Sequence, residues 1–175
     1  SLDLGLFAGR ISTRGAIASL VLLGMLVASL PALALDMAGA LTLGGKAIPG
    51  AKVTLWRTTG TGSSETIGES STDADGNFEL RNLSSSEEGS IYYITTEGGD
   101  REDVALMSVL GATPLSAVVV NELTTVASVF TSAQFIDGVT ISGNPVGVRI
   151  AAGNAPNLVD PVTGTWGSVL LNPLN

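Results

Sequence analysis

The hydrophobic and polar positions change their pattern twice along the chain. Residues 1–34 contain one continuous apolar run, residues 35–112 contain short alternating segments, and residues 113–175 repeat apolar positions at helical spacing. These patterns are typical of a signal or membrane helix, of half-buried strands and of amphipathic helices, respectively. The sequence therefore predicts a leader, a small antiparallel Ig-like β-sandwich and a helical module, giving a mainly β protein that is α+β overall.

The segment "AKVTLWR" shows the alternation most clearly. Its side chains separate into an apolar face and a face that we expect to be mostly solvated, namely Ala51, Val53 and Leu55 against Lys52, Thr54 and Trp56. "GNFELRNL" places Phe78 and Leu80 inward, and "GSIYYITTEGG" places Ile91 and Tyr93 on one face. Short runs of this kind between turn residues predict the strands of a sandwich.

The stretch "STDADGNFEL" between two of these strands has two interpretations. As a tight turn, it requires Gly76 at positive φ, with Asp73 and Asp75 in the connection. As a calcium loop of the EF-hand kind, it should have glycine at position six and glutamate at position twelve, whereas counting from Asp73 puts Gly76 at position four and Ser84 at twelve. We favour the turn and keep a weak calcium site of Asp73, Asp75 and Asn77 as an alternative. No other cofactor or metal is expected.

The apolar run in residues 1–34 has the order of a signal peptide. Arg10 and Arg14 precede the run, Pro31 ends it, and a small-x-small Ala-Leu-Ala pattern follows. Cleavage would separate Ala34 from Leu35 and place the protein in the bacterial cell envelope or the medium.

An uncleaved membrane anchor is the alternative for this run. Residues 15–35 are long enough to cross a bilayer, which takes about 20 apolar residues. In either case we expect the chain to contact the membrane only through this segment.

Residues 113–175 contain two helix starts. Asn121 is expected to cap a first helix, and Asn144 a second helix with Pro145 in its first position, extending through residue 160. A stripe on the first helix is expected to pack against the rest of the protein: Leu123, Val126, Phe130 and Ala133. This stripe and the apolar residues of the second helix can cover one another only in part: Val146, Val148 and Ile150.

Two polar groups in this part of the chain allow a binding-site interpretation. They are Asn121 and Glu122 with Thr124 and Thr125, and residues 157–160. We favour helix capping and loop hydrogen bonding for both, because no second polar cluster accompanies them.

Two stretches resemble known families. "GKAIPGAKVTLWR", "STDADGNFELRNL" and "IYYITTEGG" are similar to the carboxypeptidase regulatory-like, or prealbumin-like, family between about Met37 and Gly99, although "SSSEEGS" replaces the Pro-Gly expected before the tyrosine strand. The resemblance implies a seven-stranded accessory sandwich without peptidase activity.

"VLGATPLSAVVVNELTTVASVF" and "ISGNPVGVRIAAGNAPNLVDPVTGTWGSVLLN" resemble a helical module of secreted bacterial proteins with downstream β-propeller repeats. In that family a further helix follows, so we expect the module to be truncated here and a downstream domain of the same chain to be a partner.

Composition argues against catalysis and against nucleic-acid binding. Histidine and cysteine are absent, which removes the commonest general base, the usual zinc ligands and the thiolate nucleophile. The net charge of −8, without a basic cluster, would repel a polyphosphate. The remaining acidic runs are expected to be solvated loops: Glu87, Glu88, Asp100, Glu102 and Asp103.

These observations predict an exported, non-catalytic structural or interaction segment of a larger bacterial surface or secreted protein. Its partner would be a protein or glycan at the cell surface. The alternative is a carbohydrate-binding accessory domain of a secreted enzyme, and it depends on a few aromatic side chains: Trp56, Trp166, Tyr92 and Tyr93.

Overall fold

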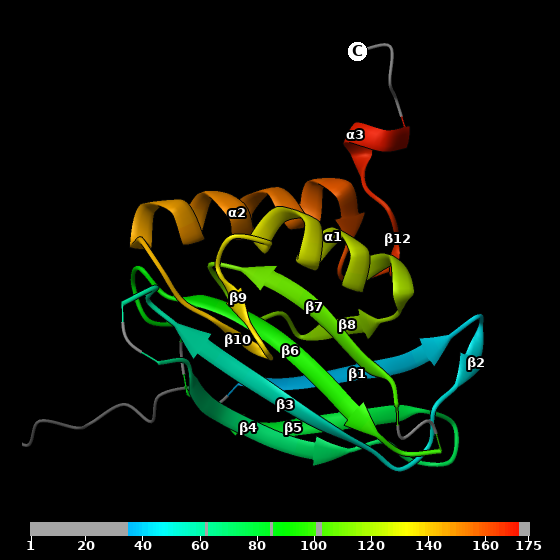
Figure 1. The fold of residues 1–175 in the computed structure, drawn as a ribbon. Coiled ribbons are helices and arrows are strands. Elements are labelled where there is room, and N and C mark those ends of the chain that lie inside the picture. The colour runs from blue at the N-terminus through cyan, green and yellow to red at the C-terminus, as the bar shows by residue number, and fades with distance from the viewer. Residues whose placement is uncertain (1–34, 62, 85, 101–102, 172–175) are drawn as a thin grey trace, which may run out of the picture. The chain divides into compact units, whose positions relative to one another are not determined.

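A computed structural model describes residues 35–61, 63–84, 86–100 and 103–171 of the chain. The expected signal segment and Ala34 lie outside the described residues, while Leu35 begins the first strand. No helix in the described part is both long and apolar enough to cross a bilayer. The described residues belong to one compact unit (Figure 1).

The first sheet has four antiparallel strands in the order β4-β3-β6-β7. Their bounds are Glu65–Ser71 for β4, Ala51–Thr58 for β3, Ile91–Gly98 for β6 and Ala105–Gly111 for β7. The central pair β3 and β6 is in register over its whole length, from Ala51 opposite Gly98 to Thr58 opposite Ile91.

The second sheet is built on β1, which pairs with three strands. The bounds are Leu35–Leu43 for β1, Lys46–Ala47 for β2, Asn77–Leu83 for β5 and Ala117–Val120 for β8. β2 and β5 are antiparallel to β1, but β8 is parallel to it, with Ala40 opposite Val119. Among the described residues, the pairings within the predicted sandwich at 35–112 are antiparallel, as expected. The parallel strand β8 comes from the predicted helical module and adds to this sheet.

The two sheets enclose the main hydrophobic core. Its members come from both sheets, and the completely buried ones include Met37, Val53, Leu55, Tyr92 and Ile94. The expected inward positions in β3 and β5 are confirmed, because Ala51, Val53, Leu55, Phe78 and Leu80 are all buried in this core. Mainly β architecture follows from this alternation.

The outer face of the first sheet is not solvated as the sequence suggested. Thr54 is 5% exposed, Tyr93 is fully buried and Trp56 is half-buried, because a helical layer covers this face. Residues of β6 (Ile91 and Tyr93), of β7 (Met107 and Val109), of the later helical layer (Val148, Ala152 and Ala155) and Ile141 form a second core there. Strands β3 and β6 are therefore buried on both faces over part of their length.

Two helices form most of this layer. Helix α1 spans Glu122–Ser132 and α2 spans Pro145–Leu158. The predicted caps are confirmed: the Asn121 side chain accepts a hydrogen bond from the Thr124 amide at 2.9 Å, and Asn144 Oδ1 accepts from the Val146 amide at 3.0 Å. Helix α2 ends two residues before the expected position, at Leu158.

Short elements complete the layer. The hairpin of β9 (Ile136–Asp137) and β10 (Thr140–Ile141) joins the helices. A second hairpin of β11 (Val159–Asp160) and β12 (Thr165–Trp166) is followed by α3 (Ser168–Leu171).

Helix α1 closes the edge of the first sheet with hydroxyl groups rather than with apolar side chains. Thr125 Oγ1 accepts from the Met107 amide at 2.9 Å, and Ser128 Oγ accepts from the Val109 amide at 2.8 Å. These amides belong to the edge strand β7, and unpaired edge groups invite pairing with other chains. The edge of β8 is closed as well, since the Val119 amide donates to the Pro161 carbonyl at 2.8 Å.

The boundary expected between residues 112 and 113 does not separate two bodies. β8 follows it in the chain yet pairs with β1, and α1 packs on β7. The predicted helical module is thus joined to the sandwich through a shared strand and a shared core.

Candidate functional site

The predicted turn at residues 73–77 is a tight, internally hydrogen-bonded connection between β4 and β5. Asp73 Oδ1 accepts from the Asp75 amide at 2.9 Å and from the Asn77 amide at 2.8 Å, and the Gly76 amide donates to the Asp73 carbonyl at 3.1 Å. Gly76 has φ +76°, as predicted for the turn. A side chain capturing its own following amides is a common way to stabilise such a turn.

The calcium candidates Asp73, Asp75 and Asn77 lie in this turn and are exposed. One carboxylate oxygen of Asp73 is already engaged by two amides, and among the described residues no three Asp, Glu, His or Cys side chains form a group that could hold a cation. Asp73, Asn77 and Glu79 do line one wall of an open depression of about 450 Å³. Weak calcium binding at this turn stays a prediction.

The aromatic candidates are mostly unavailable as a binding platform. Trp56 stacks on Tyr93 with ring centroids 6.1 Å apart, and its indole N–H donates to Thr95 Oγ1 at 2.8 Å. Tyr92 and Tyr93 are fully buried on opposite faces of β6, whereas Trp166 is 49% exposed on β12. The carbohydrate-binding interpretation therefore retains one exposed aromatic side chain among the four.

The buried Tyr93 hydroxyl links three separate segments. It donates to Ser64 Oγ at 2.6 Å and accepts from the Ile141 amide at 3.1 Å, while Ser64 donates to the Ile141 carbonyl at 3.0 Å. Burial raises the pKa of Tyr93 above its usual value, and the Ile141 hydrogen bond offsets part of this increase. This network attaches the β9–β10 hairpin to the sheet, which is a structural role.

The polar candidates near the helix ends are used in local structure. Asn121 and Thr124 form a reciprocal capping box, and Asn121 Nδ2 also donates to the Gly164 carbonyl at 2.8 Å. Asn157 Nδ2 donates to Gly153 within α2 at 3.3 Å, and Asp160 Oδ1 accepts from the Val162 amide at 2.8 Å. Through Gly164, whose amide donates to the Asp160 carbonyl at 2.8 Å, the first group contacts the hairpin that contains Asp160, so these bonds are capping and loop hydrogen bonds.

The predicted acidic loops are also dispersed. Glu87 forms an ion pair with Arg57, which pairs with Glu65 as well. Glu88, Asp100 and Asp103 are exposed, and Glu102 lies outside the described residues. The described members are thus exposed loop residues, as the sequence predicts, and Glu87 is paired with Arg57.

The sequence predicts that the two helices cover their apolar side chains only in part, and the structure has an exposed apolar surface on the helical layer. We call it the helix surface, and its exposed members are Val126 (65% exposed), Phe130 (76%), Val146 (55%), Ile150 (62%), Trp166 (49%) and Val169 (56%). The stripe expected to pack inward is therefore wrong for Val126, Phe130 and Ala133, which are exposed. The buried face of α1 consists instead of small and hydroxyl side chains: Thr124, Ala127, Ser128 and Ser132.

Two depressions adjoin on the helix surface. The smaller, about 130 Å³, is lined only by apolar side chains, which are Leu123, Val126, Ala127, Phe130, Leu158, Val159 and Trp166. The larger, about 430 Å³, shares Phe130 and Leu158 with it and adds Thr131, Asn154, Asn157 and Val169.

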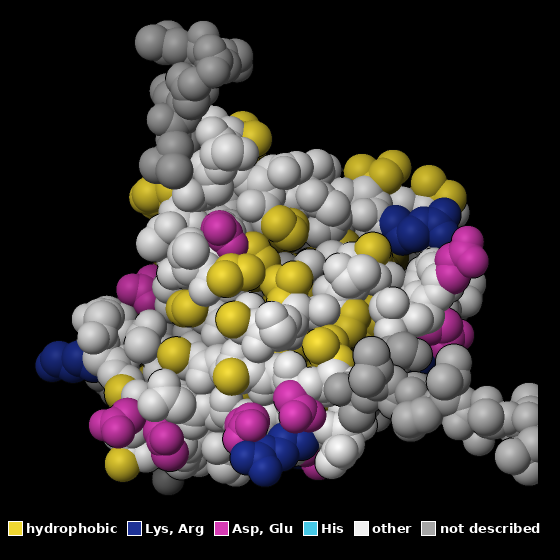
Figure 2. All heavy atoms as spheres, turned by 180° about the vertical axis from the view of Figure 1, so that it is seen from behind, with side chains coloured by type: hydrophobic (Ala, Val, Ile, Leu, Met, Phe, Trp, Pro, Cys, Tyr) yellow, Lys and Arg dark blue, Asp and Glu magenta, His cyan; other side chains and the backbone are white. Residues whose placement is uncertain are grey.

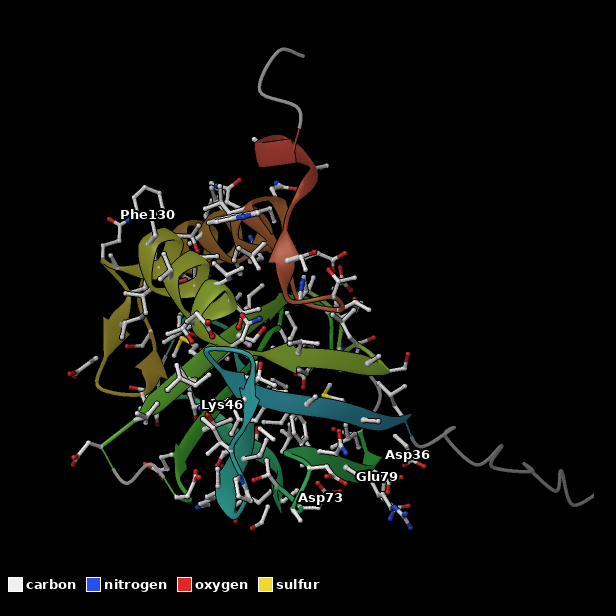
Figure 3. All side chains as sticks on the ribbon, turned by 90° about the vertical axis from the view of Figure 1, so that its right-hand side faces the viewer. Asp36, Lys46, Asp73, Glu79 and Phe130 are labelled. Carbon is white, nitrogen blue, oxygen red and sulfur yellow. The ribbon has the colours of Figure 1, made fainter. Side chains whose placement is uncertain are left out.

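The figures place this surface in the molecule. Phe130 projects from α1 at the opposite end of the molecule from Asp73 (Figure 3). Exposed hydrophobic side chains also lie along the upper margin of Figure 2, at the level where Figure 1 places the helices.

No protein-family model matches the chain, and no curated protein matches it. Part of the chain is similar to a solved structure described as the crystal structure of (S)-allantoin synthase, with a TM-score of 0.30 and 16% sequence identity. The similarity covers 50% of this chain and 42% of that chain. Such a low TM-score supports no inference about ligand or activity.

Proposed function

We propose that this chain is a non-catalytic interaction module of an exported bacterial protein, in which the helix surface binds another polypeptide. The observation that carries the proposal is the exposure of six large apolar side chains on the helical layer, four of which line two adjoining depressions. Exposed apolar patches of a few hundred Å² on a folded domain are typical of protein interaction sites.

The sandwich serves as the scaffold in this proposal. Its sheets and turn are compatible with an Ig-like, prealbumin-like accessory domain of the carboxypeptidase regulatory-like kind. Within the stretch Ile48–Leu55, the first residues lead into β3 and Ala51–Leu55 form its first part. Thr72–Phe78 forms the turn and the start of β5. The absence of histidine and cysteine from the sequence supports a non-catalytic role.

Export is proposed from the leader sequence alone. We propose that cleavage before Leu35 releases the module to the envelope or the medium, and that an uncleaved leader would hold it at the membrane instead. A downstream domain of a longer chain and a surface protein are both suitable partners for an apolar surface.

A photoreactive phenylalanine analogue at position 130 tests the proposed function in the full chain. During production in an exporting bacterium, irradiation should attach a polypeptide to this position. The same analogue at Val139, which is 40% exposed on the β9–β10 hairpin, is the matched control and should give no product. If position 130 yields no polypeptide adduct, the helix surface is not an interaction site.

Carbohydrate binding remains the second candidate because of Trp166 alone. If it is correct, titration with soluble oligosaccharides should change the tryptophan fluorescence, and the change should disappear in Trp166→Ala.

A further inference from the structure

We propose that the partner of the helix surface is a second copy of this chain, in a two-fold symmetric dimer in which Phe130 of each copy occupies the small apolar pocket of the other. This inference rests on the proposed function and adds the identity of the partner. It depends on the geometry of the pocket, the apolar area and the distribution of charge.

The pocket has the size and lining for a single aromatic ring. Its volume is about 130 Å³ and every lining residue is apolar. Cavities of about 150 Å³ lined by Leu, Ile and Phe bind benzene, whereas sites for drug-sized ligands begin at about 300 Å³. A phenyl ring is therefore a better match than a larger ligand.

The chain itself presents such a ring beside the pocket. Phe130 is 76% exposed and forms one wall of the pocket while projecting from α1 (Figure 3). In a two-fold interface the same surface patch meets itself, so a projecting group and its receptor must lie close together on one copy. Phe130 and the pocket satisfy this condition, and the two Phe130 rings would lie near the symmetry axis.

The apolar area is in the range that a stable dimer requires. Taking about 100 Å² for a buried aliphatic side chain and about 200 Å² for an aromatic one, the exposed fractions of the six members correspond to about 500 Å². A stable interface buries about 800 Å² per partner, of which a little over half is non-polar. The helix surface therefore supplies the apolar part of one interface and needs only a polar rim.

The charge distribution favours self-association through this surface. Two copies of a chain with net charge −8 repel each other. After residue 103 the sequence contains four charged residues, Glu122, Asp137, Arg149 and Asp160, and none of them lines either depression. Glu122 is directed elsewhere, since its Oε1 accepts from the Gly44 amide at 3.2 Å. Contact through the helix surface thus brings few like charges together.

Co-purification of two tagged copies tests the dimer. Two copies of the full chain with different peptide tags are produced together in one bacterium and purified through one tag in mild detergent. The second tag should be recovered with the first. Phe130→Asp in both copies should abolish the recovery, whereas the matched control Val139→Asp should leave it intact. Circular dichroism of Phe130→Asp should be unchanged, because the side chain is exposed.

The outcomes separate this inference from the proposed function. Recovery of the second tag that survives Phe130→Asp would mean that copies associate elsewhere, for example through the leader, and would overturn the dimer. Absence of the second tag in the unmodified chain would also overturn it. The proposed function would still stand if photo-crosslinking at position 130 then attached a different polypeptide, and it would fall if position 130 gave no adduct.

Discussion

Replacement of Gly39 by alanine separates the influence of local preference from that of packing in this fold. Gly39 lies in the middle of β1, opposite Phe78 of β5, and its φ is not in the left-handed region. Strand preference alone predicts that alanine stabilises the protein by about 0.5–1 kcal/mol at such a position.

Packing predicts the opposite sign. A Cβ atom at residue 39 would lie 2.2 Å from Cζ of Phe78 and 2.7 Å from both Cε atoms, well inside the usual carbon–carbon contact of about 3.5–4.0 Å. Phe78 is 4% exposed in the main core, so its ring can move away only by displacing core neighbours. Overpacking of this kind costs about 1–3 kcal/mol. The net expectation for Gly39→Ala is therefore a loss of about 1–2 kcal/mol.

Urea unfolding followed by tryptophan fluorescence measures this change. Phe78→Leu replaces the ring by a shorter side chain and should relieve the overlap. The double variant should therefore lose less stability than the sum of the losses of the two single variants, with a coupling energy of about 1 kcal/mol or more. If Gly39→Ala is as stable as the unmodified chain, or if the two substitutions are additive, the close contact between Gly39 and Phe78 does not constrain this sheet.

Five further predictions concern the turn, the sheet edge, the buried tyrosine and the leader. Gly76→Ala should lower the free energy of unfolding by about 2–3 kcal/mol in urea titrations, because φ is positive and the new Cβ would lie 2.6 Å from a backbone oxygen. The thermal midpoint of the unmodified chain should be insensitive to micromolar calcium; a steep rise that disappears in Asp75→Ala would favour the calcium loop instead. Ser128→Ala should cost about 1–2 kcal/mol by leaving a buried β7 amide without its 2.8 Å acceptor, and hydrogen exchange should be faster at that amide; unchanged exchange would argue against the edge closure. Burial raises the pKa of Tyr93, so the tyrosine in the unfolded chain ionises first as the pH rises above about 10. The free energy of unfolding should therefore fall more steeply with pH in the unmodified chain than in Tyr93→Phe. Equal slopes in the two proteins would contradict the buried hydroxyl network. Mass spectrometry of the exported protein should find Leu35 at its amino terminus; intact chain in the membrane fraction alone would indicate the anchor.

Much of the local structure follows from the sequence because it depends on neighbouring residues. The turn at Gly76 needs positive φ and an Asp that can accept its own following amides, and both requirements are visible in a stretch of five residues. The caps at Asn121 and Asn144 depend on one side chain and the next turn of helix. The inward positions of β3 follow from period-two alternation.

The exposed members of the helix surface could not be identified in this way, because α1 carries two different stripes. One stripe is apolar and includes Val126 and Phe130, and the other consists of hydroxyl and small side chains. The apolar stripe is normally the buried one, so periodicity selects it. The sequence indicates that two helices leave part of this apolar stripe uncovered, but it does not indicate that Val126 and Phe130 are the exposed members.

The sequence by itself determined the strands, the turn, the helix caps and the absence of the usual catalytic side chains. Only the tertiary structure decided which face of α1 is buried and that the outer face of the first sheet is covered. β7 is an edge strand whose amides need acceptors, and the hydroxyls of Thr125 and Ser128 supply them, which orients α1 with its apolar stripe outward. A buried amide without a partner costs about 1–3 kcal/mol, comparable to the 1.5–3 kcal/mol gained by burying one apolar side chain. Burial in this layer is therefore set by hydrogen bonds between segments distant in sequence, and such pairings exist only once the sheet has formed.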